Sequence, residues 1–168
     1  LIEYSHRVTS GLDGLLVLGL CAAALRLFPR GHRARRAAGL ALALTVIEGL
    51  LWRHLVKARL VADDASAARA MWMSIHLCNT FLLLAALALS AFFASAPLHH
   101  ARRAARTGGE RLLAALLLLG LGLVMLLGVS GAVTALGDTL FPAHSHEEVL
   151  RLSRDTSAHF LLRQRVLH

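Results

Sequence analysis

Four long apolar stretches constrain this chain more than any other feature of its sequence. They cover residues 7–28, 37–55, 70–96 and 112–136. Each approaches or exceeds the roughly 20 residues that an α-helix needs to cross about 30 Å of hydrocarbon. A soluble helix would carry charged residues on one face at every third or fourth position, and these stretches do not. The pattern therefore predicts an all-α protein, a transmembrane four-helix bundle.

The basic residues indicate how this bundle is oriented. A formal net charge of +8 would suggest a nucleic-acid partner in a soluble protein. Here the arginines gather in loops beside apolar spans, where they set topology instead, so we expect no nucleic acid. Residues 26–36 carry five arginines and no acid, and residues 98–111 carry four arginines against one acid. We therefore expect both loops to be cytoplasmic, although basic residues at positions 53–69 on the opposite side weaken the bias.

The chain begins inside a motif and stops as another apolar segment starts, so we expect a piece of a longer protein. Three parts are predicted: a first transmembrane half (1–136), an external loop (137–157) and the start of a second half (158–168). Gly137 and Pro142 are predicted to end the fourth helix, because glycine followed by proline is a common helix terminator.

Three histidines are expected at one level near the outer face, namely His6, His76 and His168. Ionisable side chains at membrane depth are costly and usually mark a functional site. Two imidazoles facing each other across a helix bundle hold haem iron in many proteins. A lone histidine often only hydrogen-bonds helices together. The similar depth of His6 and His76 favours a haem-ligand pair.

Charged residues accompany His6 at the start of the first helix. Glu3 lies three residues earlier, on the same helical face. Its carboxylate could orient an iron ligand, move a proton or position substrate, or it is only an interfacial acid. Arg7 could meet a haem propionate, or its side chain extends to lipid headgroups.

A polar stripe follows His76 on the third helix. Asn79 and Thr80 lie on the same face, three and four residues later. Glu48 in the second helix could hydrogen-bond a haem substituent, a neighbouring helix or His76. It could equally serve packing together with Gly49, and the residues alone leave these interpretations open.

Several sequence blocks resemble the haem A synthase family. They lie in the expected order along the whole chain: Glu3–Arg7, Glu48–Gly49, His76–Leu84, Gly128–Pro142 and Ala158–His168. The resemblance implies an eight-helix protein of two similar four-helix halves, each with one haem between two histidines near the outer face. It implies an oxidoreductase that converts a methyl group of haem O to the formyl group of haem A for terminal oxidases.

The resemblance also implies roles for individual residues. His6 and His76 would be the iron ligands of the first half, with Arg7 and Asn79 as further haem-binding residues. His168 would be a ligand of the second half, and Glu3 the functional acid. Haem B is the implied cofactor, with haem O and haem A as substrate and product.

The resemblance implies partners and leaves alternatives. The partners are the lipid bilayer, haem O synthase and terminal oxidase assembly proteins; a homo-oligomer is left open. The expected location is a bacterial cytoplasmic membrane, with haem towards the outer face. Some family members carry an external cysteine pair, which this chain lacks, and the fragment alone should be inactive. The alternative is a non-enzymatic cytochrome b-type electron carrier with two histidine ligands, which has no need of Glu3. A transporter is less favoured.

Overall fold

The computed structural model describes residues 2–61, 64–95, 108–142, 145, 147–148, 150–151 and 159–163 of the chain. The side chains of residues 2–3 and 162–163 are not among the described parts. The chain falls into two compact units, which are described in turn. The first comprises Leu1–Arg53 and Asn79–His100, and the second comprises His54–Cys78 and Ala101–His168.

Four long helices confirm the all-α prediction. They are α1 (Ile2–Leu27), α2 (Arg33–Lys57), α3 (Ala67–Ser95) and α4 (Gly108–Leu140), and each is long and apolar enough to span a membrane. A short helix, α6 (Phe160–Arg163), lies in the region where a further span was expected to begin. At six of their eight ends the helices extend beyond the apolar stretches into flanking residues.

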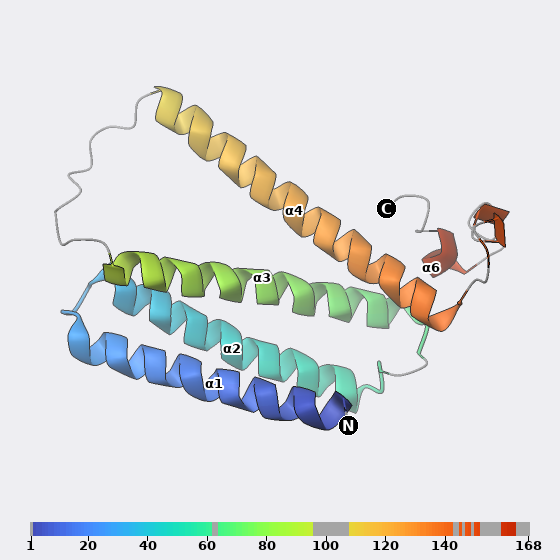
Figure 1. Cartoon of the computed structure of the whole chain (residues 1–168), viewed down its shortest axis with the longest axis horizontal. Coiled ribbons are helices and arrows are strands. Elements are labelled where there is room, and N and C mark those ends of the chain that lie inside the picture. The colour runs from blue at the N-terminus through green and yellow to red at the C-terminus, as the bar shows by residue number, and fades with distance from the viewer. Residues whose placement is uncertain are drawn as a thin grey trace. The chain divides into compact units, whose positions relative to one another are not determined.

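Local backbone chemistry explains where α1 gives way to α2. Pro29 follows the last turn of α1, and proline lacks the N–H group that would continue a helix. Gly31 then takes a positive φ of 87°, a conformation that glycine adopts at little cost. The Nδ1 atom of His32 accepts a hydrogen bond from the Ala34 backbone N–H at 3.2 Å, which caps the first turn of α2. Figure 1 shows the resulting antiparallel pair.

The loop between α2 and α3 is built from two helix caps. Just after α2, Arg59 adopts a left-handed conformation with φ 57°. The N–H group of the next residue, Leu60, donates a hydrogen bond to the Leu55 carbonyl at 2.9 Å. This pattern is the Schellman motif, in which glycine is the usual residue at the left-handed position. Ser66 is the N-cap residue just before α3, and its hydroxyl accepts a hydrogen bond from the Arg69 N–H at 3.1 Å.

The first unit has a core of mostly small residues shared by three helices. Its buried members are Val17 of α1, Ala41 and Leu44 of α2, and Ala86 of α3. On α2 the buried alanines at positions 34, 37, 38 and 41 form a stripe that leads to Leu44. Small side chains allow helix backbones to approach closely, which is how membrane helices gain packing energy.

The second unit corrects the prediction that Gly137 ends the fourth helix. The helix α4 continues through Gly137 to Leu140, and the Phe141 N–H bonds to the Gly137 carbonyl at 2.9 Å. Gly137 is buried instead, because Leu161 of α6 packs directly onto it. A Cβ atom at this position would lie 2.9 Å from the Leu161 carbonyl oxygen. The glycine thus permits a close approach of the backbones of α4 and α6.

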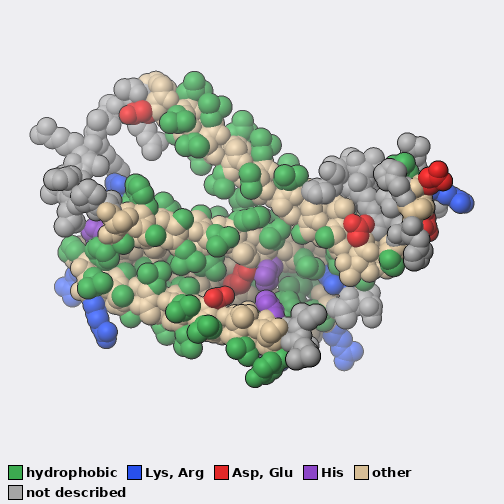
Figure 2. Space-filling model, viewed as in Figure 1, with side chains coloured by type: hydrophobic (Ala, Val, Ile, Leu, Met, Phe, Trp, Pro, Cys, Tyr) green, Lys and Arg blue, Asp and Glu red, His purple; other side chains and the backbone are tan. Residues whose placement is uncertain are grey.

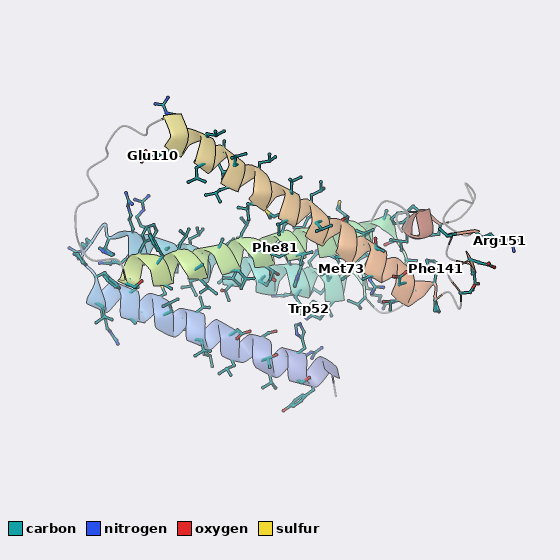
Figure 3. All side chains as sticks on the ribbon, turned by 45° about the horizontal axis from the view of Figure 1, so that its top comes forward. Trp52, Met73, Phe81, Glu110, Phe141 and Arg151 are labelled. Atoms are coloured by element: carbon teal, nitrogen blue, oxygen red, sulfur yellow. The ribbon has the colours of Figure 1, made fainter. Side chains whose placement is uncertain are left out.

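The helix α4 exposes apolar side chains on all of its sides. Leu117, Leu118 and Leu119 point in three directions around the helix, yet they are 66%, 69% and 60% exposed. Figure 2 shows hydrophobic side chains along this helix, and Figure 3 marks Glu110 near its start and Phe141 just after its end. A helix that is apolar all round belongs in a membrane or in a protein core. Together with the four spanning helices, this surface makes the chain an integral membrane protein.

Candidate functional site

His6 lies on the same side of α1 as the buried residues of that helix, although its own ring is exposed. The buried residues of this face are Val17, Cys21 and Ala24, and the helical repeat extends it towards the N-terminus through position 10 to His6. The His6 ring meets the indole of Trp52 on α2 edge-on, with ring centroids 5.3 Å apart and an interplanar angle of 76°. The first unit therefore has an imidazole and an indole in contact about one turn from the start of α1.

The His6 ring nitrogens have the chemistry that an iron ligand requires. Neither nitrogen takes part in a hydrogen bond within the described part of the chain. The ring is also exposed on the molecule's surface. A polar group without a partner is costly in hydrocarbon, so a ligand that takes one nitrogen would remove this cost. The donor therefore fits haem iron, which accepts neutral imidazole as an axial ligand.

Glu48 forms the centre of a polar cluster between α2 and α3. Its carboxylate accepts hydrogen bonds from the Asn79 side-chain amide and from the Thr80 hydroxyl. The same Asn79 amide donates a second hydrogen bond, 3.0 Å long, to the backbone carbonyl of Leu44. Asn79 is only 7% exposed, and Glu48 and Thr80 are half-buried. Of the possibilities that the sequence left open for Glu48, the structure shows the bond to a neighbouring helix.

The helical repeat explains why Glu48 points into this interface. It lies four residues after Leu44 and seven after Ala41, which are both core residues of α2. Residues at these spacings share one helical face. On α3, Asn79 likewise lies seven residues before the buried Ala86. Both members of the hydrogen bond therefore continue the buried faces of their helices.

The remaining predicted site residues are described here by their helix and their exposure. His76 is half-buried on α3, in the second unit, and Arg7 is exposed on α1. Glu3 belongs to the first turn of α1, but its side chain lies outside the described residues, as does His168 entirely. The pairing of His76 with His6 therefore stays a prediction.

Two further residues of interest, Trp52 and Asp13, were not predicted from the sequence. Trp52 lies four residues after Glu48, and this spacing on one face was the signal that could have found it. Asp13 lies in the middle of α1, where an acid is costly in hydrocarbon, and it is exposed. Among the described residues there is no group of three or more histidine, cysteine or acidic side chains arranged to hold a metal ion directly.

The chain was compared with known protein families, curated proteins and solved structures. A model of the family described as cytochrome oxidase assembly protein (COX15-CtaA) matches residues 1–157. The chain is 50% identical over 170 residues to a protein named protoheme IX farnesyltransferase in one strain of Thermus thermophilus, and equally to its counterpart in a second strain. The whole chain is matched, and it spans 27% of the length of each of these two proteins. No solved structure matches the chain.

The family match covers all four membrane helices, His6, His76 and the Glu48 cluster. The chain therefore belongs to the COX15-CtaA family of cytochrome oxidase assembly proteins, the haem A synthase family.

Proposed function

We propose that the intact protein is a membrane oxidoreductase that oxidises a methyl group of haem O to the formyl group of haem A. The observation that carries this proposal is the family match over residues 1–157, which includes both histidines of the first half. The product would then be delivered to terminal oxidases. The bacterial source of the relatives supports a bacterial cytoplasmic membrane for this chain. The arginines of residues 26–36 and 98–111 support a haem site towards the outer face.

In this proposal His6 and His76 would together hold the iron of one haem in the first half. Both lie in spanning helices, near the ends at which α1 and α3 begin. The unpartnered nitrogens of His6 support the assignment from the described structure. When bound, haem supplies an iron centre for electron transfer. Arg7 would pair with a propionate, and His168 would be a ligand in the second half.

Glu3 is proposed to handle protons beside the first haem. It lies three residues before His6 on α1, so the two residues share a helical face. With one water molecule as the oxygen source, conversion of the methyl to a formyl group releases four protons and four electrons, and the electrons would pass to an external electron acceptor. A carboxylate at that place can accept one of the protons. An electron carrier without chemistry on the macrocycle has no use for such a group, which makes Glu3 the residue that separates the two functions.

The name of the Thermus relatives supports the choice of substrate. It describes the transfer of a farnesyl group to protohaem, and haem O is the farnesylated form of protohaem. We propose that an activity of this kind supplies the substrate, and that this chain belongs to the following oxidation.

Haem extraction after co-expression tests the proposal. The full-length protein is produced with and without a haem O synthase, and the extracted haems are separated by chromatography. We expect haem A only when the synthase is present. Finding haem O alone would defeat the proposal, and farnesylated haem without added synthase would favour a farnesyltransferase. The variant Glu3→Gln should lose haem A while keeping the spectrum of bound haem, whereas His6→Ala should lose the first half's contribution to that spectrum.

A further inference from the structure

The helix α2 carries two contacts that reach towards different neighbours. Glu48 contacts α3 through Asn79 and Thr80, and Trp52, one turn later, contacts His6 of α1. These neighbours are the helices that carry the two proposed iron ligands. The helix α2 itself carries neither ligand.

We propose that Glu48 and Trp52 are positioning residues, which fix the rotation of α3 and the ring plane of His6 for haem ligation. The inference rests on the proposed function, since it needs His6 and His76 as ligands. It adds a role for α2 that the family match does not assign.

Apolar packing alone sets the rotation of α3 weakly. Lipid tails are as apolar as leucine, so helix association in a membrane has little hydrophobic drive. A rotation by one residue position turns a side chain by about 100° around the helix axis. Such a turn would point His76 away from any fixed iron. Directional hydrogen bonds remove this freedom, because donor and acceptor must stay aligned.

The hydrogen bonds of the Glu48 cluster have the geometry to restrict the rotation of α3. Two successive side chains of α3 donate to one carboxylate, and Asn79 also bonds the α2 backbone at the Leu44 carbonyl. Two donors at neighbouring angles around α3 define its rotation better than one donor can. His76 lies three and four residues before these donors on the same continuous helix, so the rotation set there is passed to it.

Trp52 plays the corresponding part for His6. The ring contact is edge-on, at 5.3 Å between centroids, which is a favoured geometry for aromatic pairs. Trp52 is half-buried, so its indole is held by its surroundings, whereas His6 is exposed and depends on this contact for its orientation. Groups that orient a metal-ligating histidine typically change metal affinity about 10–100-fold when they are replaced.

The test compares variants of the full-length protein by haem content, by the low-spin electron paramagnetic resonance signal and by midpoint potential. Glu48→Leu, the pair Asn79→Leu with Thr80→Val, and Trp52→Leu should each shift the signal and the potential and weaken haem retention about 10-fold. Thr45→Val and Ser90→Ala are the matched controls. Their hydroxyls bond to carbonyls of their own helices, at Ala41 and Ala86, so wild-type spectra are expected.

The conservative variant Glu48→Gln separates positioning from proton chemistry. The amide oxygen can still accept from Asn79, and the amide N–H can donate to the Thr80 hydroxyl oxygen, so both contacts with α3 remain and the spectrum and potential should stay near those of the wild type. If Glu48→Gln changed them as much as Glu48→Leu, or if folded Glu48→Leu and Trp52→Leu protein kept wild-type spectra, the inference would be overturned. Should His6→Ala and His76→Ala both retain the full haem content and spectrum of the wild type, the proposed function would fail, whatever the α2 variants show.

Discussion

Substituting Gly137 with alanine should destabilise the protein, although the same change normally stabilises a helix. In a helix interior alanine is favoured over glycine by about 1 kcal/mol. Gly137 lies inside α4, but a Cβ atom there would meet the Leu161 carbonyl oxygen at 2.9 Å and the Leu161 carbonyl carbon at 3.3 Å. The first distance is about 0.6 Å short of a comfortable nonbonded contact. Because the obstacle is backbone, α6 must move.

The magnitude follows from a comparison within the same helix. Gly120 of α4 has no atom within 4 Å of a Cβ built on it, so Gly120→Ala receives the helical gain without a clash. Inserting a group into a filled space typically costs about 1–3 kcal/mol. Since both variants share the helical gain, Gly137→Ala should be less stable than Gly120→Ala by about 1–3 kcal/mol.

Equilibrium unfolding in mixed micelles, followed by circular dichroism, measures this difference. Leu161 is fully buried, so hydrogen exchange in α6 should also quicken in Gly137→Ala and stay unchanged in Gly120→Ala. Equal stabilities of the two variants, with unchanged exchange in α6, would refute the close approach of α4 and α6.

Four further outcomes follow from the caps and the charge pattern. Ser66→Ala should lower stability by about 1 kcal/mol, because the Arg69 N–H loses its acceptor; Ser66→Thr should keep most of it, since its hydroxyl can still accept from Arg69 and donate to Asp64, and equal stabilities of Ser66→Ala and the wild type in chemical unfolding would contradict the cap. Arg59→Gly should raise stability by about 1 kcal/mol in the same assay, since φ is 57° there, and a loss would argue against the left-handed cap. Gly31→Ala should lower stability by about 1 kcal/mol because its φ is 87°, and a neutral effect would count against that turn. A cysteine placed at Arg30, in a variant without native cysteines, should react with a membrane-impermeant reagent only after the cells are opened, and labelling of intact cells would reverse the orientation.

The sequence predicted the helices well because membrane helices are specified by composition over long windows. About 20 apolar residues have few ways to satisfy their backbone polar groups in lipid other than as a helix. The ends were predicted less well, since they depend on single contacts. Gly137 shows the difference: its chemistry suits a helix end, but Leu161, distant in sequence, needs the space that a side chain would fill.

The residues of the candidate site could be predicted from the sequence, but their contacts could not. His6, His76 and Glu48 could be selected from sequence, because an ionisable residue in an apolar span stands out against its neighbours. The hydrogen-bond partners of Glu48 could not be predicted from the sequence, because they depend on how α2 and α3 align. The sequence offered the macrocycle, a helix and His76 as partners, and the structure shows the hydrogen bonds to Asn79 and Thr80.

The hydrogen bonds of Glu48 bear on which acid performs chemistry. A carboxylate that accepts two side-chain hydrogen bonds is held in place, and moving a proton through it would disturb the contact between α2 and α3. Glu3 lies in the first turn of α1, three residues before His6, which is why we propose it as the acid that handles protons. The division of labour that we propose, with Glu48 positioning and Glu3 handling protons, therefore follows from where each acid lies along its helix.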